Sequence, residues 1–203
     1  MSKRAGFSEK NAEKDPFVQF ERWFGERMAT QVKYPEAFTL ATASGKGDIS
    51  ARTVLLKSFS NDGFVFFTNY ESRKGQQINA SGRAAMLFYW PESERQVRIE
   101  GSVVKISVED SYAYFSTRPR ISRIGAWASR QSSEIPSRKY LEEEVAAMSA
   151  KFRGSKIPLP PHWGGYRIIP DRFEFWQEGE YRLHDRICYS LVKSSWKMSR
   201  LSP

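Results

Sequence analysis

The run Arg182-Leu-His-Asp-Arg186 places two arginines and one of the chain's two histidines within five residues. Guanidinium groups bind phosphate and carboxylate oxygens, and an imidazole can position a ring. In an alternating strand, Arg182, His184 and Arg186 share one side and Leu183 faces the other. The pattern predicts a strand whose charged face meets a partner, although a solvent-exposed face would show the same alternation.

A second cationic pair, Arg73-Lys74, follows Ser72 where a strand ending in Phe67-Thr68 gives way to a helix. The first N–H groups of a helix carry partial positive charge and bind phosphate. Two cations in that first turn are mildly unfavourable against the helix dipole, which favours a compensating anion. The segment therefore predicts a phosphate site. A plain basic first turn is the alternative interpretation.

Tyr114 and Arg118 are four residues apart, a spacing that brings them together on one helix face. Pro119 is expected to end that helix and to let Ser122 fold back towards them. A phenol, a guanidinium and a hydroxyl would then form a small phosphate clamp. A capped helix end with an exposed arginine is the alternative interpretation.

Arg52 and Lys57 lie in a third segment, an apolar strand in which Arg52, Val54 and Leu56 share one face and Lys57 lies on the other. Two surface cations on an edge strand would give this pattern. The functional interpretation is a strand that passes along a polyanionic cofactor.

These segments together resemble the pyridoxine/pyridoxamine 5′-phosphate oxidase family, whose members carry similar runs in the same order. The family runs are R-x-V-L-L-K, F-[FY]-T-N-x-x-S-R-K, E-R-Q-V, Y-F-x-S-R-P-R-x-S, K-Q-S-S, and F-W-Q-G followed by R-L-H-D-R. The chain matches them between Asp15 and Pro203, with Thr117 and Arg130 as mild departures. Many members also have an R-x-x-Y segment that folds over the substrate; the first 14 residues lack it, so the resemblance does not extend to substrate closure.

The resemblance implies flavin mononucleotide (FMN) as the cofactor, with its phosphate on Thr68, Arg73 and Lys74. The full set of implied FMN contacts is Arg52, Thr53, Val54, Leu55, Leu56, Lys57, Phe67, Thr68, Arg73, Lys74, Gln96, Gln131, Ser132, Trp176 and Arg186. The implied substrate contacts are Lys57, Tyr114, Arg118, Ser122, Arg182, Leu183 and His184. Arg182 and His184 are the implied catalytic pair, which orients the substrate ring.

The implied reaction oxidises pyridoxamine or pyridoxine 5′-phosphate to pyridoxal 5′-phosphate, with dioxygen as acceptor and hydrogen peroxide as product. The resemblance also implies a homodimer with FMN at the subunit interface. Two alternatives remain: a split-barrel flavin reductase or oxidoreductase with another substrate, and a non-catalytic anion- or nucleic-acid-binding barrel. The Tyr114, Arg118 and Ser122 clamp favours the oxidase.

The composition and charge pattern argue against a nucleic-acid-binding, membrane-spanning or exported protein. The chain has 203 residues and a net charge of +9, but its cations are interleaved with acidic and aromatic residues, and no nucleic-acid-binding motif is present. No apolar run approaches the roughly 18 residues of a membrane span, and the first ten residues contain no apolar signal core. The single cysteine, Cys188, excludes an internal disulfide and a cysteine-based zinc site, and we expect no metal. These features predict a cytoplasmic protein that binds neither nucleic acid nor membrane.

Turn signals and apolar periodicity predict a flexible segment over residues 1–14 and a single FMN-binding domain over residues 15–203. Helices are expected over residues 16–30, 72–80, 108–117 and 137–152. Strands are expected over residues 38–42, 49–57, 64–68, 84–90, 96–105, 165–169, 172–177, 187–192 and 196–200. Many short strands without βαβ alternation predict a mainly β, α+β chain built on an antiparallel, Greek-key-like split β-barrel.

Overall fold

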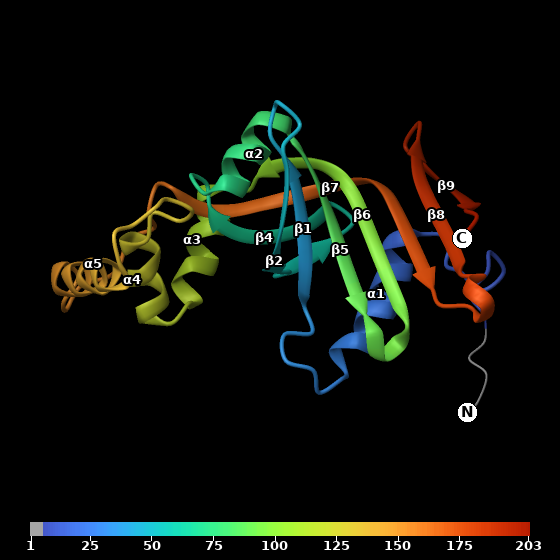
Figure 1. Ribbon diagram of the computed structural model, residues 1–203, viewed down its shortest axis with the longest axis horizontal. Coiled ribbons are helices and arrows are strands. Elements are labelled where there is room, and N and C mark those ends of the chain that lie inside the picture. The colour runs from blue at the N-terminus through green and yellow to red at the C-terminus, as the bar shows by residue number, and fades with distance from the viewer. Residues whose placement is uncertain (1–5) are drawn as a thin grey trace.

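Strands with alternating burial pair antiparallel in one nine-stranded sheet that curls into a half-barrel (Figure 1). The computed structural model describes residues 6–203. The strands are β1 (Ala37–Ala43), β2 (Ile49–Leu55), β3 (Ser58–Ser60), β4 (Gly63–Asn69), β5 (Arg83–Trp90), β6 (Arg95–Lys105), β7 (Trp163–Gln177), β8 (Asp185–Val192) and β9 (Ser195–Arg200). Their order is β2-β1-β5-β6-β7-β4-β3, and β8 and β9 extend the sheet from β7. The predicted antiparallel α+β fold is confirmed, whereas a single domain over residues 15–203 stays a prediction.

The α-helices of the described part lie on the inner face of the sheet and at its ends. They are α1 (Pro16–Met28), α2 (Arg73–Ser81), α3 (Val108–Thr117), α4 (Arg120–Ala128) and α5 (Arg138–Lys151). Asp15 and Ser72 cap α1 and α2, because each side chain accepts a hydrogen bond from a backbone N–H of the first turn. Helix α4 was not predicted. Helices α3, α4 and α5 form a lobe at the left in Figure 1, far from β8 and β9. No helix within residues 6–203 is long and apolar enough to cross a membrane.

Strand β7 changes its pairing partner half-way along. Residues 163–168 pair with β4 and residues 172–177 pair with β8, while β6 runs beside both halves. The register shifts at Gly101 of β6, opposite Pro170. A Cβ at Gly101 would lie 2.1 Å from the carbonyl oxygen of Ile169, so the close approach requires glycine. The two strands expected here are therefore one bent strand.

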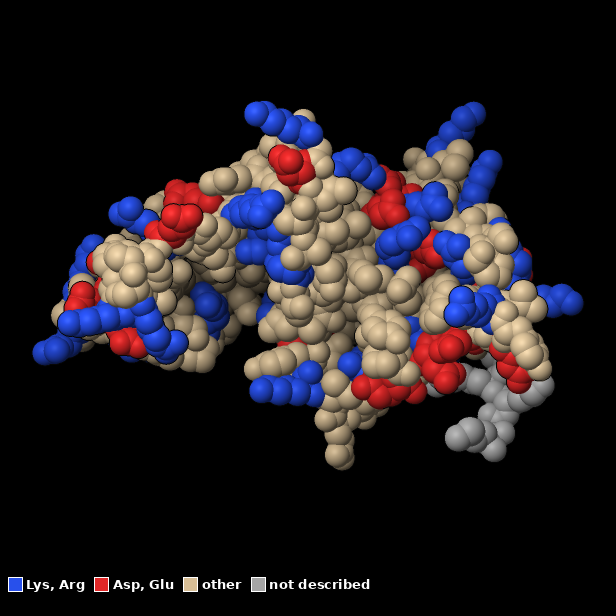
Figure 2. All heavy atoms as spheres, viewed as in Figure 1, with Lys and Arg blue, Asp and Glu red and all other residues tan. Residues whose placement is uncertain are grey.

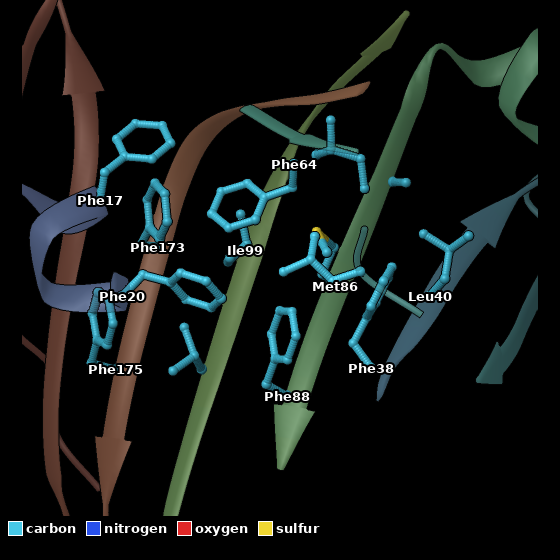
Figure 3. Packing of buried hydrophobic residues seen from close by; sticks show 14 of the residues in the cluster. Phe17, Phe20, Phe38, Leu40, Phe64, Met86, Phe88, Ile99, Phe173 and Phe175 are labelled. Atoms are coloured by element: carbon cyan, nitrogen blue, oxygen red, sulfur yellow. The ribbon is translucent and has the colours of Figure 1, made fainter. Parts of the chain in front are cut away.

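Aromatic residues on one face of α1 join the helix to the concave side of the sheet (Figure 3). Phe20 is fully buried, and its ring centroid lies 4.9 Å from that of Phe64. Phe17 lies 5.2 Å from Phe173 in an edge-to-face arrangement. The three- and four-residue spacing of the aromatics in α1 therefore marks the core face of this helix.

Residues 6–14 pack against the C-terminal strands. Phe7 is 3% exposed, and its backbone N–H donates to the Asp185 carboxylate at 2.9 Å. The Tyr189 hydroxyl donates to a backbone carbonyl of this segment at 2.6 Å. One buried aromatic, Phe7, therefore anchors an otherwise polar segment, and the expected flexibility of residues 1–14 stays a prediction. Residues 1–5 lie outside the described residues.

We expect Phe7→Ala to lower the free energy of unfolding by about 3 kcal/mol, because the ring fills the core 4.8 Å from Trp23. Urea denaturation monitored by tryptophan fluorescence measures this change. Lys10→Ala is the matched control in the same segment, and we expect it to stay within about 0.5 kcal/mol of the unchanged protein. Equal midpoints for the two variants would show that this segment does not stabilise the core.

Candidate active site

A cavity of about 660 Å³ opens where β2 and β4 meet helices α3 and α4. Residues from most of the predicted motifs lie in its wall: Arg52, Thr53, Val54, Leu55, Lys57, Phe67, Thr68, Lys74, Tyr114, Arg118, Ser122 and Gln131. Residues that the motifs did not predict complete it: Asn69, Gly125, Ala126, Ser129 and Trp163. Figure 2 shows Lys and Arg side chains beside the hollow between the helical lobe and the sheet. We call these residues the pocket half-site.

Lys74 reaches this cavity from the first turn of α2. Its Nζ donates to Gln131 Oε1 at 2.9 Å, Thr68 Oγ1 at 3.1 Å and Ser72 Oγ at 3.3 Å. Burial, and then the neighbouring charge of Arg52, lower the pKa of Lys74 to about 8. All of these acceptors are neutral, so the ammonium lacks a counter-charge.

Two further cations lie near Lys74. Arg52 is half-buried, and burial together with the charge of Arg73 lowers its pKa. Arg73 itself is exposed at the start of α2. No Asp or Glu within residues 6–203 forms an ion pair with any of the three. Two cations in the first turn of α2, with Arg52 of β2 beside them, suit a multiply charged anion such as a phosphate.

Arg118 is another cation without a counter-charge in the cavity wall. Its Cζ lies 4.6 Å from the ring centroid of Trp163, and its Nη1 is buried without a hydrogen-bond partner. Burial lowers its pKa. Tyr114 stacks on Phe67 with centroids 3.9 Å apart. Arg118 follows the end of α3 in an extended conformation, so a turn, rather than the predicted shared helix face, brings it near Tyr114.

Ser122 enters the cavity wall from the first turn of α4, not from a loop that folds back. The spacing of Ile121, Ile124 and Ala128 was the signal for this helix. A hydrogen bond of 3.0 Å between His162 Nε2 and the carbonyl oxygen of Ala126 holds α4 against the start of β7. This contact agrees with a structural role for His162.

Three other predicted residues lie side by side at the far end of the sheet. The register pairs Gln96 with Trp176 and Trp176 with Arg186, so all three side chains share the outer face of β6, β7 and β8. The Trp176 and His184 rings are 4.7 Å apart. The buried carboxylate of Glu174 accepts a hydrogen bond from Arg186 Nε at 2.8 Å. We call Gln96, Trp176, Arg182, His184 and Arg186 the sheet-end half-site.

A tight turn, and not a strand, carries Arg182 and His184. Arg182 lies in a 3-10 turn with φ of 63°, and β8 begins one residue after His184. The prediction that alternation places Arg182, His184 and Arg186 on one strand face is therefore wrong. Leu183 is 70% exposed. A Cβ at Gly179 would lie 2.1 Å from the carbonyl oxygen of Leu183, so this glycine allows the turn to close.

The remaining predicted residues lie at the margins of the pocket half-site. Leu56 is 4% exposed in the core just after β2 ends. Lys57 lines the cavity, and its Nζ pairs with Glu36 at 3.4 Å. Ser132 is exposed in the loop that also carries Gln131 and has φ of 74°.

The two half-sites lie at opposite ends of β7. Trp163 lines the cavity and Trp176 belongs to the sheet-end half-site. A strand of 15 residues spans up to roughly 45 Å. One chain therefore does not gather both half-sites around one small ligand.

Comparison with known proteins establishes the family. A family model described as "Pyridoxamine 5'-phosphate oxidase" matches residues 24–152, and one described as "Pyridoxine 5'-phosphate oxidase C-terminal dimerisation region" matches residues 163–203. The chain belongs to the pyridoxamine 5′-phosphate oxidase family. The segment that matches the dimerisation region contains most of the sheet-end half-site.

Relatives of this oxidase family match nearly the whole chain. The pyridoxine/pyridoxamine 5′-phosphate oxidase of Rubrobacter xylanophilus is 52% identical over 98% of this chain and 92% of its own, and that of Burkholderia multivorans is 54% identical over 98% and 94%. Among solved structures, PhzG from Burkholderia lata 383, in complex with tetrahydrophenazine-1-carboxylic acid, has a TM-score of 0.90, 32% identity and 98% coverage of each chain. An FMN-binding, oxidase-related protein from Nostoc punctiforme has a TM-score of 0.72 at 20% identity, covers 94% of this chain and 100% of its own, and shows the shared split-barrel fold.

We expect Lys74→Met to raise the melting temperature of the ligand-free oxidase-family chain at pH 7 by a few degrees, because it removes a partly buried, unpaired cation. The folded-state pKa of about 8 lies below the ordinary value of 10.5, so the penalty is full below pH 8 and fades as pH rises towards 10.5. The gain over the unchanged protein should shrink across that range. Differential scanning fluorimetry at several pH values measures it.

The rise in melting temperature on addition of inorganic phosphate is a second measurement on the Lys74→Met variant. We expect added phosphate to stabilise the unchanged protein more than Lys74→Met, since bound ligand stabilises the folded state. Lys46→Met, which removes an exposed cation, is the control. If Lys46→Met and Lys74→Met behave alike, Lys74 does not carry an uncompensated charge.

Proposed function

We propose that the chain is an FMN-dependent oxidase that converts pyridoxamine 5′-phosphate and pyridoxine 5′-phosphate to pyridoxal 5′-phosphate, with dioxygen as acceptor. One observation carries the proposal: a single cavity holds two cationic positions, Lys74 with Arg52 and, separately, Arg118, and no carboxylate within residues 6–203 neutralises either. One position suits the phosphate of FMN and the other that of the substrate. A relative named pyridoxine/pyridoxamine 5′-phosphate oxidase, which is 52% identical to this chain, supports the proposal. We also propose a cytoplasmic location, which the lone buried Cys188 fits.

FMN fits the pocket half-site by charge. Arg73 and Lys74, at the N-terminus of α2, and Arg52 beside them would hold its phosphate. Gln96, Trp176 and Arg186 from a second protomer would contact its ring. When bound, FMN accepts two electrons from the substrate and passes them to dioxygen, which yields hydrogen peroxide.

The substrate phosphate would bind at Arg118, whose Nη1 is buried and unpaired. Tyr114 and Ser122 add hydroxyl groups from the same wall of the cavity. Arg182 and His184 of the second protomer would lie against the substrate ring and orient its 4′ carbon. No Asp or Glu lines the described cavity, so these residues position and polarise the substrate instead of acting as strong bases.

A homodimer would bring the two half-sites together. The outer face of β1, β2 and β5 is lined by small and apolar residues, which are Ala41, Ala43, Ile49, Ala51 and Ala85. Ile49 is 76% exposed on this face. The same face continues to Gln96 and Trp176, and Thr53 on it also lines the cavity. An isologous pair that covers this face can place one protomer's pocket half-site against the other's sheet-end half-site.

A second substrate class follows from one observation. The chain is 32% identical to PhzG over 98% of both chains, and the PhzG structure holds a phenazine carboxylic acid. Arg118 can bind a carboxylate as well as a phosphate. The alternative is therefore a flavin oxidase with a tricyclic carboxylate as substrate.

Aerobic incubation of the FMN-loaded protein with pyridoxamine 5′-phosphate tests the proposal. We expect pyridoxal 5′-phosphate, ammonia and hydrogen peroxide in equal amounts. Unphosphorylated pyridoxamine and a reduced phenazine carboxylate are the parallel substrates. Oxidation of the phenazine compound alone would reject the vitamin B6 substrate and retain the flavin assignment.

Arg118→Ala and Arg182→Ala should affect different kinetic constants. Arg118 would contact only the phosphate, remote from the reacting carbon, so its loss should raise KM about tenfold to 150-fold with kcat nearly unchanged. Arg182 would orient the ring, so its loss should lower kcat as well. Lys139→Ala, an exposed cation on α5, is the control. A fall in kcat for Arg118→Ala with unchanged KM would contradict the assigned roles.

Mixed dimers test the shared site. One protomer carries Lys74→Ala and Arg118→Ala, its partner carries Arg182→Ala and His184→Ala, and two affinity tags isolate the heterodimer. If each site combines both chains, one of the two sites is intact, and we expect about half of the unchanged activity. Each doubly substituted homodimer should be nearly inactive. A heterodimer no more active than these parents would show that each site is formed within one chain.

A further inference from the structure

Among the described residues, every acceptor of the Arg52 guanidinium is neutral. Its Nη1 donates to Thr42 Oγ1 at 2.6 Å and to the carbonyl oxygen of Leu40 at 3.1 Å. Its Nη2 donates to Ser50 Oγ at 2.5 Å. The side chain is therefore fixed on both nitrogens while its positive charge remains available.

The hydroxyl groups of Thr42 and Ser50 both donate hydrogen bonds to one buried amide, that of Gln77. Gln77, on α2, is 5% exposed, and its Oε1 accepts from Thr42 Oγ1 and from Ser50 Oγ, each at 2.6 Å. A guanidinium only donates, so each hydroxyl must turn its hydrogen towards Gln77. Gln77 Nε2 donates to the carbonyl oxygen of Asp48 at 3.1 Å, which sets the orientation of the amide. The direction of every hydrogen bond in this network is thereby determined.

In the sheet-end half-site, Arg186 has a negatively charged partner, unlike Arg52. Arg186 pairs with the buried carboxylate of Glu174, which also accepts from Arg98 Nη2 at 2.6 Å. The chain thus neutralises a site arginine in one place and leaves another charged. A glutamate at position 77 could accept the same two hydroxyl hydrogens, so the neutral amide is the feature that keeps Arg52 uncompensated.

We propose that Gln77 is a positioning residue that holds Arg52 through Thr42 and Ser50 and preserves its positive charge for the phosphate of FMN. This inference rests on the proposed function. Gln77 does not line the cavity, and it acts only through Arg52.

Gln77→Glu tests the role of charge, because it places a carboxylate where Oε1 lies 3.5 Å from Arg52 Nη2. We expect the Kd for FMN to rise about tenfold or more. The Kd for riboflavin, which lacks the phosphate, should change less than about twofold. Quenching of flavin fluorescence measures both constants without turnover. Gln76→Glu adds the same charge at an exposed neighbour on α2 and should leave the FMN-to-riboflavin ratio unchanged.

An unchanged ratio in Gln77→Glu would overturn the inference and leave the proposed function standing. Failure of the unchanged protein to bind either flavin would instead reject the proposed function, and this inference with it. If Gln77→Glu does not fold, Thr42→Val and Thr42→Ser decide the matter. Thr42→Val removes one acceptor of Arg52 and should weaken FMN selectively, whereas Thr42→Ser should restore binding. Equal ratios in these two variants would also overturn the inference.

Discussion

The change of partner along β7 determines where every site residue lies. A strand has only two edges for hydrogen bonding, and β6 occupies one edge of β7 from Tyr166 to Gln177. The other edge pairs with β4 near Trp163 and with β8 near Trp176. The bend at Gly101 and Pro170 separates these halves. The cavity consequently forms at one end of the strand and the aromatic and arginine group at the other.

The cavity is distinguished by the uncompensated positive charge of its wall as well as by its shape. Lys74, Arg52 and Arg118 are each partly removed from water without a carboxylate beside them, and burial lowers the pKa of each. Such an arrangement is unfavourable in the ligand-free chain, because an unpaired cation loses solvation. The same arrangement favours a phosphate, which restores the missing counter-charge. The proposed phosphate binding would therefore be obtained at the expense of the stability of the ligand-free protein.

In the sheet-end half-site, by contrast, the positive charge of Arg186 is paired with a carboxylate. Glu174 lies between Arg98 and Arg186, and Arg186 also donates to the carbonyl oxygen of Ser202 near the C-terminus. These contacts fix Arg186 as a rigid donor with most of its charge balanced. A rigid, balanced surface can approach a second copy of the chain without a large desolvation cost. In the proposed homodimer, the outer sheet face would join the surface that contacts the second protomer to the surface that contacts the ligand.

Some features followed from the sequence alone because they depend on near neighbours. Asp15 and Ser72 cap the helices that follow them, and β5 and β6 form over nearly the residues predicted for these strands. Most of the residues that line the cavity were also predicted from the motifs, because the cationic and hydroxyl side chains that suit a phosphate can be recognised in the sequence. The helix α4 was missed because Pro119 was taken to begin a loop.

Other features depended on contacts between distant segments. The burial of Phe7, the turn that carries Arg182 and the neutral network around Gln77 each join residues far apart in the chain or depend on a backbone conformation that alternation does not reveal. The sequence by itself determined which side chains are available and which local elements carry them. The tertiary structure decided which cations lack a counter-charge and which residues face one another, because desolvation and pairing depend on the surroundings in three dimensions.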